Sequence, residues 1–316
     1  MTTTVVDPTS VEPTPLELAH KQFRQELLDA GLLFDTGVAG VYGRAAGFEA
    51  IVDGLDGLLT SMRPTNARVL RFPPVFARQT FEATEYISSF PHLAGTVQTF
   101  TGDTADHREL LAARAEGRDW DGWFDPAQTV LVPAACHPVY PLYAGTVNNP
   151  GAVVDVHGYC FRHEPSVDPA RMQSFRMREF VRIGDPDVTE QHRDEWIARA
   201  QGALTDLRLP FETAGANDPF FGRVGRLLAV NQRDDGLKVE LVVRLYGDLD
   251  DGTAVVSGNC HREHFGEAFA ITTADGAVAH SACVGFGLER LALGLLRTHG
   301  LDFARWPEAV RKRLSL

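Results

Sequence analysis

The sequence predicts an α+β fold in which helices flank a mostly antiparallel sheet. Short apolar runs, broken by Pro, Gly and Asp, predict strands along much of the chain after residue 67. Long segments separate these runs, and helical periodicity is confined to a few places instead of following each strand. This distribution is typical of α+β domains.

Amphipathic periodicity predicts the helices. The first begins at Thr14, an N-cap followed by a proline at the first helical position and by Glu17 at the third, and it stops at Gly31. The second helix has one apolar face, made of Phe48, Ile51, Val52, Leu55 and Leu58. Two further helices are expected over residues 189–207 and 287–299.

The expected strands cover residues 68–72, 129–133, 152–156, 239–245, 254–257 and 268–272. Residues 1–13 lack periodicity and are expected to form a disordered leader, followed by a single domain over residues 14–316. The segment 217–230 is expected to be a helix, either packed in the core or exposed for an acidic partner.

Composition limits the location and the partners. No apolar run approaches the roughly 20 residues of a membrane span, and the polar N-terminus lacks a signal-peptide apolar region. Four scattered cysteines, without a CxxC pair, do not indicate a disulfide framework, so a cytoplasmic location is expected. A net charge of −12 argues against a nucleic-acid partner without excluding one.

Two charged segments stand out, and the first could bind an anion. The first contains Phe161-Arg162-His163-Glu164, then a loop, then a strand with Arg176 and Phe180. An arginine can hold a phosphate or carboxylate through two parallel hydrogen bonds, and an aromatic ring can stack on a base. The second is Gly285-Phe286-Gly287-Leu288-Glu289-Arg290, which begins the last apolar helix.

Together, in this order, the two segments resemble motifs 2 and 3 of the class II aminoacyl-tRNA synthetase catalytic core. The resemblance implies that Arg162 holds the α-phosphate of ATP and the amino-acid carboxylate. Glu164 would contact the adenine amino group, and Phe180 would stack on the ring. Arg176 and Arg290 would hold the γ-phosphate. The acid that often closes motif 2 is replaced by Gly184.

A fainter likeness concerns the dimer interface. The segment Arg71-Phe72-Pro73-Pro74-Val75-Phe76, which continues to residues 85–91, is similar to motif 1 of seryl-tRNA synthetases. That motif forms the interface of a dimer in the family, so the resemblance implies a homodimer.

Two sets of residues could bind a metal. One is local and lies in Cys260-His261-Arg262-Glu263-His264, where a strand would place only Cys260 and His264 on one face. The other combines Cys136, Glu179 and Cys283. Their places match those of the zinc ligands in atypical, methanogen-type seryl-tRNA synthetases, which implies one zinc per subunit with an open position for the substrate amino group.

Magnesium is also expected, because residues 254–260 resemble the strand that supplies magnesium ligands in these enzymes. Ser257 and Asn259 on this strand are expected to bind substrate, but Ala254 replaces the usual glutamate. Glu240, on the preceding strand, could supply an acidic group instead, or could be an ordinary solvated residue.

The expected reaction follows from the resemblance. About 35 residues precede the core and 26 follow Arg290, so the tRNA-binding domains of seryl-tRNA synthetases are not expected. The resemblance then narrows to the amino acid:[carrier protein] ligases, which form an aminoacyl adenylate of glycine or alanine from ATP. These ligases transfer the aminoacyl group to the phosphopantetheine thiol of a carrier protein. A synthetase acting on tRNA and a non-catalytic regulatory paralogue remain open as alternatives.

Overall fold

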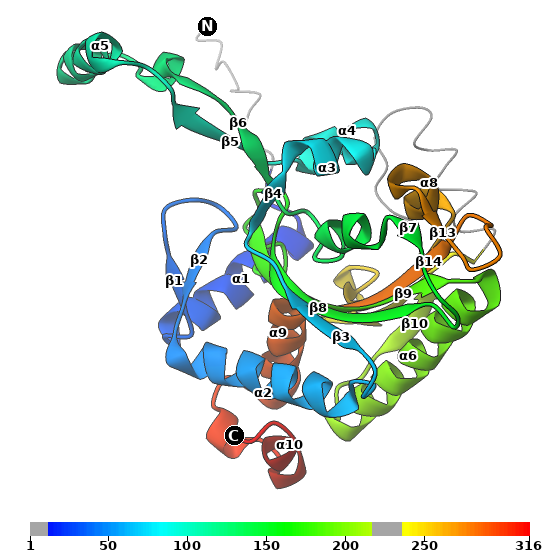
Figure 1. The fold of residues 1–316 in the computed structure, drawn as a ribbon. Coiled ribbons are helices and arrows are strands. Elements are labelled where there is room, and N and C mark those ends of the chain that lie inside the picture. Colours follow the sequence, from blue (N-terminus) through cyan, green and yellow to red (C-terminus); the bar gives the residue numbers. More distant parts are fainter. Residues whose placement is uncertain (1–11, 217–235) are drawn as a thin grey trace, which may run out of the picture.

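The computed structural model describes residues 12–216 and 236–316. Its centre is a seven-stranded sheet with the order β10-β11-β12-β14-β9-β8-β3 (Figure 1). The β3–β8 pair is parallel and the other pairs of this sheet are antiparallel, as the predicted α+β fold requires. The strands are β3 (Arg68–Arg71), β8 (Ala152–Phe161), β9 (Ser174–Gly184), β10 (Glu212–Gly215), β11 (Lys238–Val243), β12 (Thr253–Arg262) and β14 (His280–Gly287).

Long helices cover one face of this sheet. They are α1 (Pro15–Asp29), α2 (Ala46–Met62), α6 (Pro186–Asp206) and α9 (Leu288–His299), with the short α10 (Glu308–Arg313) and 3-10 turns η4 (Gly247–Leu249) and η5 (Phe303–Arg305) nearby. Their buried apolar side chains join those of β9, β11 and β14 in one core cluster. The cap of α1 forms as predicted, because Thr14 accepts from the Glu17 amide and Glu17 accepts from the Thr14 amide.

Short helical segments cover the opposite face and form a second core cluster there. They are α3 (Arg78–Ala83), α4 (Tyr86–Ser89), η1 (Pro91–Leu93), η3 (His137–Tyr143) and α8 (His264–Phe269). Two small sheets accompany the central one, namely β1 (Leu33–Asp35) with β2 (Tyr42–Arg44), and β13 (Ile271–Thr272) with β7 (Gly145–Thr146). Because short segments leave room between them, this face can hold a cavity.

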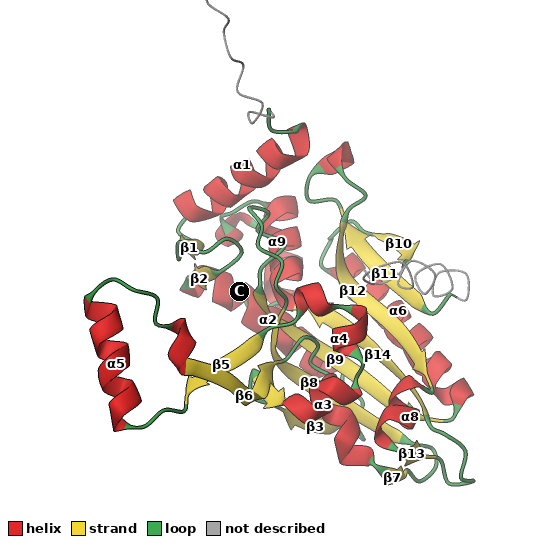
Figure 2. Ribbon diagram, turned by 90° about the horizontal axis from the view of Figure 1, so that it is seen from above, coloured by secondary structure: helices red, strands yellow, loops and turns green. Residues whose placement is uncertain are grey.

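An arm projects from the body of the molecule (Figures 1 and 2). It consists of β5 (Thr96–Phe100), α5 (Thr104–Ala115), η2 (Asp121–Trp123) and β6 (Phe124–Leu131), and β6 also pairs with β4 (Val75–Ala77). Phe124 packs edge-on against Phe100 and Trp120 near the tip. The sequence patterns predicted only the last residues of β6 and did not indicate the arm.

Most predicted elements are confirmed, with one exception. The segment 268–272 was expected to be a strand, but α8 extends to Phe269 and only Ile271–Thr272 is extended. The predicted strand over 129–133 is the end of the longer β6. The predicted helix at 217–230 lies outside the described residues, as does most of the expected leader. None of the described helices is long and apolar enough to span a membrane.

A buried ion pair ties β8 to β9. Arg178 and Asp155 are both fully buried, and the guanidinium donates to both carboxylate oxygens at 3.0 and 2.6 Å. Arg178 also donates to Asp56 and Thr60 of α2. The pair therefore fixes β9, which carries much of the cavity described below, against both its neighbouring strand and α2.

We predict that Asp155→Ala destabilises the protein by about 3 kcal/mol or more, because it leaves the Arg178 charge buried without its bidentate partner. Urea unfolding monitored by circular dichroism measures the change. Glu195→Ala, which removes the exposed partner of Arg199, is the matched control and should cost less than about 1 kcal/mol. Equal effects of the two substitutions would show that the buried pair does not anchor β9.

Candidate active site

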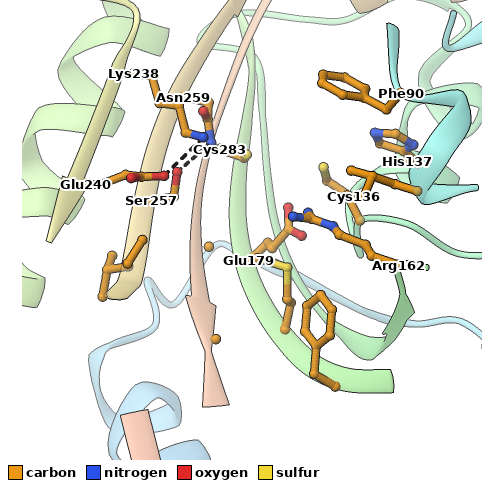
Figure 3. Close-up of a pocket in the computed structure, with 18 of the residues that line it drawn as sticks. Phe90, Cys136, His137, Arg162, Glu179, Lys238, Glu240, Ser257, Asn259 and Cys283 are labelled. Atoms are coloured by element: carbon orange, nitrogen blue, oxygen red, sulfur yellow. Dashed lines mark hydrogen bonds and ion pairs between the residues drawn. The ribbon is translucent and has the colours of Figure 1, made fainter. Parts of the chain in front are cut away.

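A cavity of about 550 Å³ lies on the face of the sheet that the short helices cover. Its floor comes from β9, β12 and β14, and its walls come from the α3–α4 region, η3 and α8. Figure 3 shows side chains from these segments pointing into a common space, with Glu179 and Cys283 on the sheet and Cys136 and His137 opposite. The cavity thus draws on parts of the chain that are far apart in sequence.

Three side chains converge at one end of this cavity. The two Sγ atoms of Cys136 and Cys283 and a carboxylate oxygen of Glu179 all lie within 4.8 Å of one another. Glu179 and Cys283 come from the paired strands β9 and β14, whereas Cys136 directly precedes η3. The backbone amide of Ala135 donates to Glu179 at 2.9 Å and orients its carboxylate.

The chemistry of this cluster suits a cation. All three side chains are at most 4% exposed. Burial raises the pKa of Glu179 to about 7, and a hydrogen bond with Cys136 lowers the pKa of Cys283 well below its usual range. The hydrogen bond with Cys283 and burial raise the pKa of Cys136 well above its usual range. Three groups buried together become anionic only when a cation balances their charge, and thiolates and carboxylates are ordinary zinc ligands. Three protein ligands leave one tetrahedral position for another ligand.

The second predicted metal site, the local one at Cys260 and His264, is not formed. Among the described parts of the chain, Cys136, Glu179 and Cys283 make the one group of three converging ligands. His264 is turned toward the backbone carbonyl of Thr84, 3.3 Å from its Nε2. Cys260, His261 and His264 therefore do not form a group of three converging ligands.

Arg162 lies next to this cluster. It follows β8, its Nε donates to the carbonyl of Pro133 at 3.0 Å, and its guanidinium lies 5.6 Å from the ring centre of Phe175 (Figure 3). Arg162 and Glu164 both line the cavity. The guanidinium of Arg162 therefore faces both the Cys136–Glu179–Cys283 cluster and the ring of Phe175.

Arg290 lines the other end of the cavity from the start of α9. Its Nε donates to the carbonyl of Ala170 at 2.9 Å, and its Nη1 donates to the carbonyl of Ala254 at 3.1 Å. Burial lowers the pKa of its guanidinium. These contacts fix the side chain between the β8–β9 loop and β12, where it faces the same space as Glu164.

The two β9 residues assigned to ATP need correction. Phe180 is fully buried on the opposite face of the sheet, where it stacks on Trp196 of α6 with ring centres 3.6 Å apart. Arg176 points the same way and donates to Glu289 at 2.7 Å and to Glu49 at 2.9 Å. Neither side chain lines the cavity, because alternate residues of a strand face opposite sides.

The cavity side of β9 carries Phe175, Met177 and Glu179 instead. The spacing Arg-x-x-x-Phe also occurs five residues earlier, in Arg171 and Phe175. Arg171 lies beside the cavity residue Glu164, with Nη1 3.6 Å from Oε1. With Phe175 as the aromatic, the acid four residues later is Glu179, so the apparent loss of an acid at Gly184 disappears.

Ser257 and Asn259 of β12 also line the cavity, as does Glu240 of β11. Glu240 is paired with Lys238 at 3.0 Å, and Asn259 donates to Ser257 at 3.3 Å (Figure 3). Ala254 lies in the cavity wall, so a methyl group stands where the motif interpretation expected an acid. The expected magnesium therefore stays a prediction, with Glu240 as the nearby acid.

Comparison with known proteins places the chain in a family. No family model matches the sequence. The amino acid–[acyl-carrier-protein] ligase 1 of Bradyrhizobium diazoefficiens is 45% identical over 287 residues, which cover 90% of this chain and 88% of that protein. The type-2 serine–tRNA ligase of Methanococcus aeolicus is 29% identical over 195 residues, and the match spans only 37% of that longer protein.

The fold comparison agrees with the sequence comparison. The M. kandleri seryl-tRNA synthetase, solved in complex with A. aeolicus tRNASec, superposes with a TM-score of 0.79 at 23% identity, covering 93% of this chain and 60% of that one. This likeness shows the fold of a class II synthetase core. By its close relationship to the Bradyrhizobium enzyme over almost its whole length, the chain is a ligase and belongs to the amino acid–[acyl-carrier-protein] ligase family.

Proposed function

We propose that this protein activates a small amino acid, glycine or alanine with glycine preferred, as an aminoacyl adenylate. It then transfers the aminoacyl group to the phosphopantetheine thiol of a carrier protein. The observation that carries this proposal is one cavity in which a buried Cys136–Glu179–Cys283 cluster, Arg162 and the Phe175–Arg290 region lie side by side. The family membership supports the reaction type.

The amino acid would bind at the cluster end. Cys136, Glu179 and Cys283 would hold one zinc, which when bound supplies a Lewis-acidic position for the neutral amino group of the substrate. Arg162 would hold the carboxylate by charge-assisted hydrogen bonds. Ser257 and Asn259 line the wall beside Cys283 and would contact the substrate between these two ends.

ATP would bind at the other end of the cavity. The ring of Phe175 offers a face for adenine, and Glu164 can accept from the adenine amino group. Arg290 supplies a cation for the phosphates, and Arg162 lies between the two substrates. These placements replace Phe180 and Arg176 in the interpretation from sequence.

The reaction would proceed in two steps. A carboxylate oxygen of the amino acid attacks the α-phosphorus, the bond to the β-phosphate oxygen breaks, and pyrophosphate leaves. Arg162 and Arg290 stabilise the negative charge that develops on the phosphates. The thiolate of the carrier then attacks the carbonyl carbon of the adenylate, a thioester forms, and AMP leaves with the bonding electron pair.

Exchange of pyrophosphate with ATP tests the first step, and labelled acceptors test the second. We expect glycine-dependent exchange, and transfer of labelled glycine to a carrier that bears phosphopantetheine but not to the same carrier without it. Labelling of tRNA would replace the proposal by the synthetase alternative. No exchange with any amino acid would favour the regulatory alternative. The homodimer, the single domain and the cytoplasmic location also stay predictions.

A pair of phenylalanines tests the corrected ATP site. We predict that Phe175→Ala raises the KM for ATP by about tenfold, in line with roughly 1–3 kcal/mol for stacking on a base, and lowers the melting temperature less than Phe180→Ala does, because Phe175 is only partly buried. Phe180→Ala should instead cost about 3–5 kcal/mol of stability, because it empties a core position against Trp196. A larger KM effect from Phe180→Ala, measured well below its melting temperature, would restore the original assignment.

The pH dependence of zinc stabilisation tests the metal site. The folded-state pKa of Glu179 is about 7, above about 4.3 for a free glutamate. In the metal-free protein, protonation of Glu179 therefore stabilises the folded state, and this stabilisation is complete below the lower pKa. It is lost as the pH rises through the higher, folded-state pKa. Zinc replaces the proton, so the melting-temperature gap between zinc-loaded and metal-free protein should grow from about pH 5.5 to about pH 8.

Glu179→Gln is the control, because it removes the titrating carboxyl and should leave only the part of the dependence that comes from deprotonation of the cysteine thiols, chiefly Cys136. A gap that is the same at both pH values in the unmodified protein would contradict the assignment of Glu179 as a ligand. Protein that carries no zinc after purification and takes up none would contradict the metal site as a whole.

A further inference from the structure

We propose that His261 is a positioning residue that donates a hydrogen bond from Nε2 to the Cys283 thiolate, and so sets the affinity of the metal site. The inference rests on the proposed function, since it concerns the zinc that Cys136, Glu179 and Cys283 would hold. It adds a residue outside the ligand set, taken from the segment that the sequence analysis had considered as a separate metal site.

The end of β12 aims His261 at the cluster. The pairing of β12 with β14 is regular up to Cys260 opposite Ala282, then shifts so that Arg262 lies opposite Ser281. His261 is the extra residue of this bulge, and Arg262 has a positive φ of 52°. Bulges commonly re-aim one side chain at a functional site. Here the imidazole Nε2 lies 3.6 Å from Sγ of Cys283.

The partners of the other ring nitrogen fit a proton on Nε2. Nδ1 lies 3.2 Å from the hydroxyl of Ser281 and 3.4 Å from the hydroxyl of Tyr140. Either hydroxyl can donate to Nδ1 of a neutral imidazole, which leaves the proton on Nε2. A thiolate only accepts, so Nε2–H directed at Cys283 is complementary to that sulfur, while Nδ1 accepts from a hydroxyl.

The geometry distinguishes this role from that of a ligand. A zinc ion lies about 2.0–2.3 Å from each nitrogen or sulfur ligand, so all ligand atoms must lie close to one another. His261 is absent from the group whose atoms all lie within 4.8 Å, although it touches one member of that group. Asn259 is a weaker candidate for donating to the thiolate, since its Nδ2 lies 4.0 Å from Cys283 and also bonds to Ser257.

Packing holds the ring in place. The imidazole contacts Phe265 edge-on at 4.9 Å between ring centres, and Phe265 in turn stacks on Tyr140 at 3.8 Å. Both aromatic side chains are buried. The donor is thus fixed before the metal arrives, as expected for a group that orients a metal ligand.

Two substitutions at this position separate the hydrogen bond from the packing. His261→Phe keeps a flat ring but removes the donor, whereas His261→Gln keeps an N–H donor of similar reach. Loss of a group that orients a metal ligand typically lowers metal affinity about 10- to 100-fold. We expect that loss in His261→Phe, and less than about tenfold in His261→Gln, when zinc affinity is measured by competition with a chromophoric chelator.

The cobalt-substituted protein gives a spectroscopic readout that packing alone would not move. A hydrogen bond lowers the energy of the thiolate lone pairs, so its loss should shift the sulfur-to-cobalt charge-transfer band of His261→Phe to longer wavelength. His264→Phe is the control, because His264 contacts the same Phe265 but bonds to Thr84 instead of the cluster. Its affinity and band should match those of the unmodified protein.

The outcomes separate this inference from the proposed function. If the unmodified protein binds neither zinc nor cobalt, the metal site itself is wrong. If it binds both, and His261→Phe retains the affinity and the band of the unmodified protein, the role of His261 alone is wrong. Equal losses of zinc affinity in His261→Phe and His261→Gln, with an unshifted charge-transfer band, would also overturn the role of His261. The shape of the side chain, and not its hydrogen-bond donor, would then determine the affinity.

Discussion

The antiparallel pairing of β9 with β14 is the constraint on which the site depends. It places Glu179 opposite Gly285 and Cys283 opposite Val181, so the carboxylate and the sulfur rise from neighbouring strands on one face of the sheet. Glycine at 285 matters here, because a Cβ there would lie 2.8 Å from the Met177 side chain and 3.3 Å from that of Glu179. A small residue beside Glu179 therefore leaves room for its carboxylate.

The two faces of the sheet have different roles that follow from the same pairing. One face is a buried core in which Phe180 stacks on Trp196, and in which Arg178, paired with Asp155, also donates to Asp56 of α2. The other face carries the cavity, with short helical segments as walls. Rigid packing below the sheet supports the precise placement of polar groups above it, which a metal or phosphate site requires.

Local signals in the sequence predicted the elements well, because caps and apolar stripes depend on near neighbours. The capping box of Thr14 and Glu17 is an example, as is the apolar stripe of α2. The arm could not be predicted in this way, because β5 has no buried residue and its strands lack a clear apolar face. Likewise, the contact of His261 with Cys283 depends on the pairing of β12 with β14, which no spacing reveals.

The assignment of Phe180 failed for a reason that strand geometry could have exposed. Glu179 and Phe180 are adjacent in one strand, so they cannot both face the same cavity. Once Glu179 is taken as a ligand, the aromatic residue that stacks on adenine must also have an odd number in this strand, so that it faces the cavity. Phe175 meets this condition and fits the motif spacing. Cys136 and Cys283 could be brought together only through the resemblance, since their contact requires the tertiary fold.

The central claim is that Cys136, Glu179 and Cys283 hold a metal that receives the amino group of the substrate. Crystals soaked with glycine and a non-hydrolysable ATP analogue, measured at the zinc absorption edge, test it most directly. The account predicts an anomalous peak among these three side chains, with the glycine nitrogen next to the peak and its carboxylate at Arg162. An empty cluster, or glycine bound with its amino group turned away from the peak, would contradict it.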